Sequence, residues 1–456
     1  MEEFKSTRYF LDLKDLFLTP IFLIIYYIIA VFLRNKFSNK VTKKYFLPAL
    51  TLKFIGAIGL GLIYRYMYYG GDTANYYFHT KLITAAFYES PLAGFKLIFL
   101  EAGFDPETYK YTSLMFWYGA DTEYMIARIA AIPSIFSYNT YSVIAITFAA
   151  ISFSGMWAMY LTFLKIYPDL AKQFAIAVFF LPSVFFWGSG FMKDSITIGA
   201  LGWTFYGFYN LLILKVKIPT SLFAFVLGAA ALASIKIYIL LCFLPPALFW
   251  LFNEYNSRIQ NSIVRLISKP LFFAVGLSVA ALGATKITEG DAKYDINNIA
   301  ETTKVTSRYL SEQVTSGSQY NIGNLDGSVS SMVKATPQAI IVSLYRPFLW
   351  EARNPTMLLS AIEALYFLLF SLYCIYKAGI IKTFYIISSI PVVNFSLIFS
   401  LLFAFAVGLN SGNFGTLVRY KIPLMPFYLS ALFIIQGNSN SKKQRKKNLI
   451  QLKRSF

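Results

Sequence analysis

Residues 219–252 read PTSLFAFVLGAAALASIKIYILLCFLPPALFWLF, an apolar stretch in which Lys236 is the single charged residue. One continuous helix of this length would run about 51 Å at about 1.5 Å per residue, which exceeds a hydrocarbon core of about 30 Å. Two helices that break at Lys236 fit the bilayer, and they keep every later basic loop on one side of the membrane. A Pro-Pro pair disturbs the second half. The stretch therefore predicts two short transmembrane helices, 219–235 and 237–252.

Apolar blocks recur along the whole chain, which is 57% hydrophobic and only 14% charged. Soluble domains carry about 25% charged residues, and blocks of about 16–25 apolar residues match the thickness of a bilayer. A transmembrane β-barrel would instead show alternating segments of about ten residues. The sequence therefore predicts an all-α polytopic membrane protein, a single transmembrane domain over residues 1–456 with about eleven spans. These spans are expected near 17–34, 47–66, 139–164, 174–189, 195–214, 219–235, 237–252, 270–286, 356–376, 384–407 and 422–436.

The net charge of +19 comes largely from Lys and Arg in short loops between apolar blocks and in the tail 437–456. Such residues set the orientation of a membrane protein and attract anionic lipid headgroups, so the charge does not indicate nucleic acid as a partner. The basic loops all fall on one side if the N-terminus lies outside and the C-terminus lies in the cytoplasm. Cys242 and Cys374 lie inside apolar blocks and His79 is the single histidine. This argues against a disulfide framework, a zinc site or another histidine-rich metal centre.

Two long segments then lie outside the membrane. The first, 67–138, contains apolar pieces too short to span, such as PLAGFKLIFLEAG, and these predict helices along the membrane surface. The second, 287–355, is the longest polar part of the chain, and it predicts a small domain or a cap over the outer face.

The first of these segments contains Tyr-Gly-(Gly/Ala)-Asp-Thr twice, at Asp72 and at Asp121. Each motif fits a Gly-permitted turn followed by an Asp that caps a helix. Each also fits a carboxylate just outside the membrane that can take a proton from a sugar hydroxyl or hold a divalent cation. Both interpretations stay open, because a capping Asp can still face a cleft. The neighbouring aromatic residues either stack on sugar rings or form the usual interfacial belt, and the candidates for stacking are Tyr76, Tyr77 and Trp117.

Several basic residues occur on the side of the membrane that the orientation rule disfavours. A Lys or Arg kept there predicts an anion site, since Arg grips phosphate oxygens with two donors and a helix N-terminus adds its dipole. The alternative is that each side chain simply reaches for the interface. The candidates for phosphate binding are Lys193, Arg346, Arg419 and Lys421. Further candidates are Asp194, Lys236, Glu351 and Glu363; the last lies within an expected span, and its partner stays open among Lys236, Arg346 and Arg419.

The stretches GGDTANYY (70–77) and RYKIPLMP (419–426), with many spans and an acid in the first large outer loop, resemble bacterial glycan-assembly membrane proteins. These are the GT-C glycosyltransferases and the O-antigen or exopolysaccharide polymerases, and the first stretch is similar to the GxDxxxY opening of the exopolysaccharide polymerases. The resemblance implies a sugar donor on polyprenyl phosphate or pyrophosphate, reaction at the outer side of the cytoplasmic membrane, and Asp72 as the loop acid. GT-C enzymes carry that acid after their first span, whereas Asp72 follows the second expected span, which leaves the assignment of the base open.

The resulting prediction is a membrane glycosyltransferase or polysaccharide polymerase in which Asp72, or else Asp121, activates the acceptor hydroxyl. A transporter or flippase for an anionic or lipid-linked substrate would use the same basic residues, although no internal repeat typical of transporters is evident. A non-catalytic membrane subunit of an envelope complex is a third interpretation. The chain contains no P-loop, dinucleotide-binding, serine-triad or metalloprotease motif. No cofactor is indicated beyond a divalent cation.

Overall fold

The computed structural model describes residues 10–256, 259–261, 299–312, 319–320, 322–323 and 325–439. These residues form helices joined by short connections, and no β-strand occurs among them. The expected span 270–286 lies outside the described residues, as do most of the tail and part of the segment 287–355.

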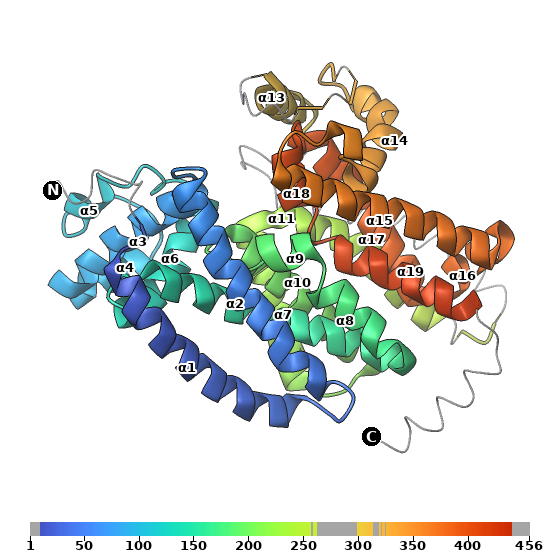
Figure 1. The fold of residues 1–456 in the computed structure, drawn as a ribbon, viewed down its shortest axis with the longest axis horizontal. Coiled ribbons are helices and arrows are strands. Elements are labelled where there is room, and N and C mark those ends of the chain that lie inside the picture. The colour runs from blue at the N-terminus through green and yellow to red at the C-terminus, as the bar shows by residue number, and fades with distance from the viewer. Residues whose placement is uncertain are drawn as a thin grey trace.

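The helices of the first half of the chain run from the blue end of Figure 1 to its green middle. They are α1 (Leu13–Phe37), α2 (Lys43–Tyr66), α3 (Asp72–Glu89), α4 (Pro91–Phe99), α5 (Tyr109–Thr112), α6 (Asp121–Phe136), α7 (Tyr141–Ile166), η2 (Pro168–Leu170), α8 (Ala171–Phe179), α9 (Pro182–Trp187), α10 (Lys193–Phe208) and the π-helical turn η3 (Tyr209–Leu214). The second half contains α11 (Ile218–Asn256), α13 (Ile299–Glu312), α14 (Val329–Tyr345), η4 (Leu349–Glu351), α15 (Pro355–Ala378), α16 (Ile380–Ser389), α17 (Pro391–Ser411), α18 (Phe414–Tyr420) and α19 (Met425–Ser439).

Seven helices in the described part of the chain are long and apolar enough to cross a membrane, or eight if α18 and α19, bent by 67°, form one broken span. The fold is therefore that of a polytopic helical membrane protein, whereas eleven spans are not confirmed. Prolines account for two differences from the expected spans. Pro182 begins α9, so the block 174–189 forms two short helices, and Pro391 divides the block 384–407 between α16 and α17. Proline lacks the backbone N–H donor that would continue the preceding helix.

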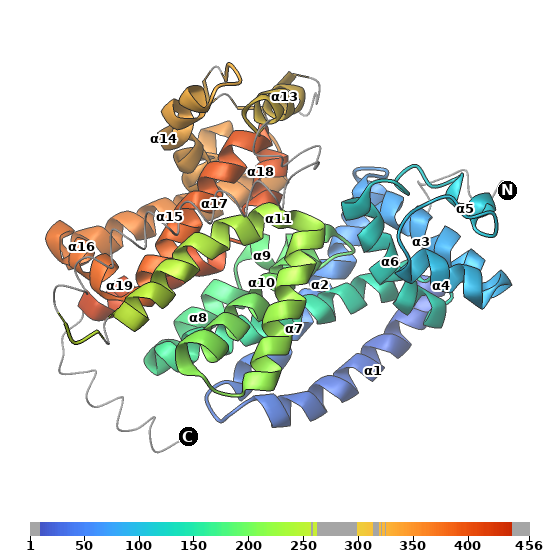
Figure 2. The ribbon, with the colours of Figure 1, turned by 180° about the vertical axis from the view of Figure 1, so that it is seen from behind.

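The expected break in the block 219–252 is confirmed at Lys236, whose backbone leaves the helical region at φ −146° and ψ 74°. Figure 2 shows the two arms of α11 diverging from their junction beside α18. The Lys236 ammonium lies 4.7 Å from the ring centroid of Tyr420 at the end of α18. The break thus places a charged side chain at one end of the bundle.

Helix α7 lies at the centre of the bundle, where it packs against α2 and α10 and is buried along most of its length. Small residues let its backbone approach that of α10. A Cβ atom on Gly155 would lie only 1.9 Å from the Gly199 carbonyl oxygen, so any larger residue at position 155 would push the two helices apart. This close packing fixes where the N-terminus of α10 emerges.

Helices α3 to α6 form a second unit with a hydrophobic core of their own. Leu82 and Ile83 of α3 pack in that core with Ala127 of α6. Helices α3 to α6 therefore pack against one another, and the expectation that pieces of 67–138 lie along the membrane surface stays a prediction. Helix α4 nevertheless turns the side chains of Leu92, Phe95 and Phe99 outward, as a helix that contacts a membrane surface would.

Candidate functional site at one end of the helix bundle

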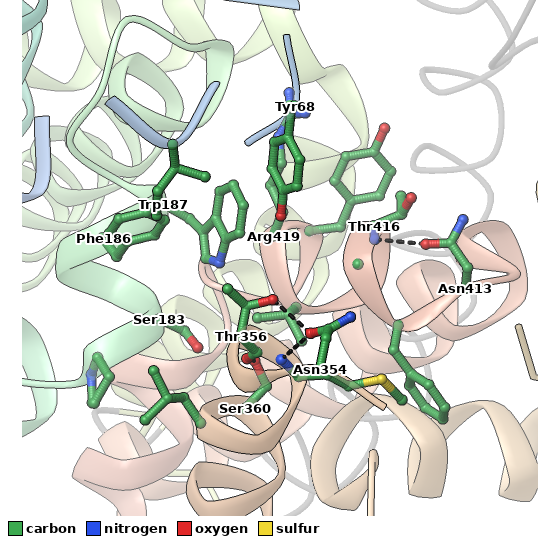
Figure 3. A pocket seen from close by; sticks show the side chains of 18 of the residues that line it. Tyr68, Ser183, Phe186, Trp187, Asn354, Thr356, Ser360, Asn413, Thr416 and Arg419 are labelled. Atoms are coloured by element: carbon green, nitrogen blue, oxygen red, sulfur yellow. Dashed lines mark hydrogen bonds between the residues drawn. The ribbon is translucent and has the colours of Figure 1, made fainter. Parts of the chain in front are cut away.

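A cavity of about 680 Å³ lies between the end of α2, helix α9, the start of α15 and helix α18 (Figure 3). This volume is in the usual range for sites that bind small molecules. Its wall combines aromatic rings with amides and hydroxyls, and its charged members are one acid and one base. The lining includes Tyr68, Asp72, Trp187, Asn354, Asn413 and Arg419.

Arg419 connects the cavity to a buried cluster of charges. Its Nη1 donates to Asp72 Oδ2 at 2.8 Å, and its Nε donates to Asp194 Oδ2 at 2.5 Å. Lys236 Nζ donates to the other oxygen of Asp194 at 2.5 Å. The Asp194 side chain is 2% exposed, whereas that of Asp72 is 43% exposed. Two acids and two bases make the cluster neutral, as burial of charges in a low-dielectric region requires.

Glycines shape the turn that leads to Asp72. Gly70 and Gly71 have φ of +137° and +105°, which residues with a Cβ rarely adopt. Asp72 is the first residue of α3 and Asp121 is the first of α6, and neither helix start has a side-chain capping bond. The prediction that each motif begins a helix is confirmed, and the prediction of an Asp cap is wrong at both. Each Asp stands one position inside its helix, where the dipole favours a negative charge but the side chain is available for other partners.

The second motif differs from the first in its partners. Asp121 is exposed and has no hydrogen bond or ion pair with the described residues. Glu123 forms an ion pair with Lys193 instead, and Lys193 Nζ also donates to Thr122 Oγ1 at 2.8 Å. Burial raises the pKa of Glu123, but the hydrogen bond and charge of Lys193 and the bond from Thr122 together leave the pKa below its ordinary value. Lys193 thus has a carboxylate partner outside the cavity lining.

Arg346 and Lys421 hold the connection between α14 and α15. Arg346 binds the Glu351 carboxylate through two nitrogens, with Nε to Oε2 at 3.0 Å, and the Phe348 amide donates to the same oxygen at 2.8 Å. Burial raises the pKa of Glu351, but these bonds leave it below its ordinary value. Lys421 Nζ donates to the Arg346 carbonyl at 3.2 Å. Of the four basic residues predicted to bind phosphate, Arg419 is the one in the lining of this cavity.

The aromatic residues predicted to stack on sugars do not line the cavity. Tyr76 and Tyr77 are buried, and Tyr77 donates its hydroxyl proton to the Asn139 carbonyl at 2.6 Å. The ring of Trp117 packs against that of Tyr76 at 5.1 Å between centroids. The rings that do line the cavity include Tyr64, Tyr68 and Trp187. Of these, Tyr68 lies just before the first Tyr-Gly-x-Asp-Thr motif.

Two further charges are buried away from the cluster. Glu363, 6% exposed, accepts a hydrogen bond from the Ser183 amide at 2.9 Å, and no ion pair joins it to any of its expected partners. Lys53, which the sequence reasoning missed, is 1% exposed and donates to Ser152 Oγ at 3.0 Å and to the Gly188 carbonyl at 2.6 Å. A single Lys inside the apolar block 47–66 was the available signal, since charges within spans are costly and mark buried polar contacts.

A divalent cation at Asp72 stays a prediction. In the part of the chain that the structure describes, no group of three or more His, Cys, Asp or Glu side chains is placed to hold a metal ion. No protein-family model, no curated protein and no solved structure matches this chain. A function therefore has to be inferred from the chemistry of the cavity and its neighbours.

Proposed function

We propose that this protein is a membrane glycosyltransferase or polysaccharide polymerase that uses a polyprenyl-(pyro)phosphate-linked sugar at the outer face of the bacterial cytoplasmic membrane. The observation that supports it most is the contact between Asp72 and Arg419 in the lining of one cavity. A half-exposed carboxylate and a guanidinium side by side supply the two charges that glycosyl transfer needs. One can accept a proton and the other can stabilise a phosphate leaving group.

In the proposed reaction the acceptor hydroxyl oxygen attacks the anomeric carbon of the lipid-linked sugar. The new carbon–oxygen bond forms as the bond between the anomeric carbon and the phosphate oxygen breaks. Asp72 accepts the hydroxyl proton, and the electron pair of the broken bond stays on the phosphate. Arg419 uses Nε and Nη1 to hold Asp194 and Asp72, so Nη2 is the donor that stabilises the leaving phosphate.

The rest of the lining suits a saccharide. Tyr68 and Trp187 offer ring faces on which a sugar can stack. The side-chain carbonyls of Asn354 and Asn413 are already used as helix caps, accepting from the amides of Met357 and Thr416 (Figure 3). Their amide NH₂ groups take part in none of the described bonds and are available as donors to sugar hydroxyls.

A deletion strain tests the proposal. We expect loss of long polysaccharide, with accumulation of single lipid-linked units for a polymerase or a one-sugar truncation for a monosaccharide transferase. Complementation with the wild-type chain should restore the glycan, and Asp72→Asn should not. An unchanged glycan profile in the deletion strain would refute the proposal and favour a non-catalytic envelope subunit.

A transporter or flippase for an anionic or lipid-linked substrate is the second candidate. The broken pair α18–α19, bent by 67°, contributes Arg419 to the cavity, and discontinuous helices beside a binding site are typical of transporters. Vesicles with purified protein separate the two candidates. Movement of a lipid-linked saccharide across the bilayer without a new glycosidic bond would favour the transporter.

The proposed orientation has its own test. Single cysteines replacing Gly103 and Val329, in a chain lacking Cys242 and Cys374, should react with an impermeant thiol reagent in spheroplasts, because both positions are exposed on segments expected outside. A cysteine replacing Lys40, in the basic α1–α2 connection, should be protected. The reverse labelling pattern would invert the proposed topology.

A further inference from the structure

We propose that Glu363 is a proton-binding site directly behind the cavity, and that binding of an anionic substrate in the cavity takes up one proton there. This inference rests on one part of the proposed function, namely that the substrate that binds in the cavity carries a phosphate. It adds a regulated property, a pH-dependent affinity, that neither glycosyl transfer nor transport requires.

Glu363 is joined to the cavity wall by a hydrogen bond from Ser183 and lies near a second serine of that wall. Ser360 lines the cavity and lies one helical turn before Glu363 on α15, and Ser183 lines it from α9. Figure 3 shows these serines on two different elements that face the same space. The Ser183 amide donates to Glu363 Oε2 at 2.9 Å. The carboxyl group is therefore one residue layer away from any ligand.

The surroundings of Glu363 offer few hydrogen-bond donors to its ionised carboxylate. A carboxylate can accept about four hydrogen bonds. Glu363 receives the described bond from Ser183 on Oε2, while Oε1 is buried without a hydrogen-bond partner. A buried negative charge with so few donors is unfavourable, so a modest change in the local field decides whether the group holds a proton.

Lys421 is the charged side chain whose field acts on Glu363. Lys421 is 3% exposed and donates to the Arg346 carbonyl, and it forms no direct ion pair with Glu363. Other titratable groups on elements packed against α15 have partners of their own or are exposed. Glu351 is bound to Arg346, Tyr345 and Tyr428 bond each other through their hydroxyls at 2.7 Å, and Arg419 of α18 is bound to Asp72 and Asp194, with Tyr420 beside Lys236. Lys334 of α14 and Lys382 and Tyr385 of α16 are exposed.

An anion bound in the cavity adds a negative charge near Glu363 and Lys421. This charge disfavours the ionised form of Glu363, so Glu363 holds its proton more tightly in the anion-bound protein than in the empty protein. By linkage the proton must favour anion binding to the same extent. Affinity is therefore highest at low pH and falls as pH rises, by at most about tenfold per pH unit for one proton.

The test measures binding of one probe, the methyl ester of a polyprenyl phosphate, to the full-length protein in nanodiscs across the neutral pH range. The phosphate of this diester keeps a single negative charge throughout, so the probe itself does not titrate. Wild type should lose affinity with rising pH. Glu363→Gln, which is permanently neutral, should bind independently of pH and, at the alkaline end, at least several-fold more tightly than wild type. A merely structural role would give no such gain.

Infrared difference spectra supply a second measurement. The carbonyl stretch of a protonated carboxyl should appear when the probe binds to wild type, and it should be absent from Glu363→Gln. Glu101→Gln is the matched control, because Glu101 is exposed and does not line the cavity. It should behave as wild type in both experiments.

The failures of the two proposals can be told apart. A folded wild-type protein that binds the probe with a flat pH profile overturns the proton site and leaves the proposed function standing. A pH dependence that persists in Glu363→Gln assigns the titration to another group, such as Lys421, and also overturns the proton site. Absence of binding at every pH overturns the anionic substrate, and both proposals with it.

Discussion

The two Tyr-Gly-x-Asp-Thr motifs share their local sequence and differ in everything beyond it. Both begin a helix at the Asp. Asp72 lines the cavity and binds Arg419, a residue 347 positions further along the chain, whereas Asp121 is exposed and has no partner among the described residues. The comparison teaches that the motif sets a turn and a helix start, while the fold decides whether its carboxylate has a function.

The anchor of each motif explains the difference. Asp72 follows α2 after a short glycine turn, so it stays at the end of the bundle where Arg419 and Asp194 lie. Asp121 instead follows the connection from α5 to α6, and its side chain is exposed there. In that motif the acid that reaches the bundle is Glu123, through Lys193.

The largest expected effect is a loss of stability when Asp194 is replaced, because Asp194 joins Arg419, the partner of Asp72, to Lys236. Asp194→Asn removes the buried charge that Arg419 and Lys236 share, and breaking a buried pair in this way lowers stability by about 3–5 kcal/mol. Thermal unfolding in detergent should show the loss. Asp194→Asn combined with Lys236→Met removes one charge of each sign and should recover part of it. Wild-type stability for the single variant would mean that the cluster does not hold the bundle end together.

The next effect separates the two motifs directly. Asp72→Asn keeps a hydrogen-bonding side chain but cannot accept the acceptor proton, so we expect activity to fall about 10²-fold or more with normal folding. Asp121→Asn should change neither folding nor activity by a measurable amount. Glycan assembly in complemented cells and transfer by purified protein measure both. Near-normal activity of Asp72→Asn would reduce Asp72 to a structural partner of Arg419, and a dead Asp121→Asn would reverse the two roles.

Arg419→Lys should lower activity by about tenfold or more while the protein stays in the membrane at a normal level. A Lys ammonium cannot reproduce the planar fork that reaches Asp72 and Asp194 while leaving a donor for phosphate. Arg353→Lys is the matched control, because Arg353 is exposed near the start of α15 and does not line the cavity. Equal activity of Arg419→Lys and wild type would exclude recognition by the guanidinium fork.

Local signals predicted much of the fold. The length of the apolar stretch 219–252 predicted the break at Lys236, because helix rise and bilayer thickness are fixed quantities. The predicted number of spans was not confirmed, because hydropathy does not report which residues can continue a helical backbone. Pro182 and Pro391 divide apolar blocks that look continuous by composition. The core between α3 and α6 was also missed, since it depends on which faces meet.

The sequence predicted which residues belong to the candidate site, but it did not predict which of them contact one another. Asp72, Asp194, Lys236 and Arg419 were all candidates because charges are rare in this chain and costly near a membrane. Their contacts join α3, α10, α11 and α18, and no sequence spacing reports such a contact. The pairing of Glu363 with the Ser183 amide was hidden for the same reason.

The smallest expected effect concerns the second motif, where the comparison predicts that Glu123 matters and Asp121 does not. Burial raises the pKa of Glu123, but the bond and charge of Lys193 and the bond from Thr122 together leave it below its ordinary value. A carboxyl whose pKa is lowered by folding stabilises the protein at pH values above its unfolded pKa, about 4.3, and loses that contribution as pH falls through the folded pKa. Because Glu123 is nearly one third exposed, solvent screening limits the effect, and Glu123→Gln should cost about 1 kcal/mol at neutral pH. The stability gap between wild type and Glu123→Gln in thermal unfolding should close as the pH falls below that range, whereas Asp121→Asn should match wild type throughout. A gap that does not change with pH would mean that Glu123 acts through packing rather than through its charge on Lys193.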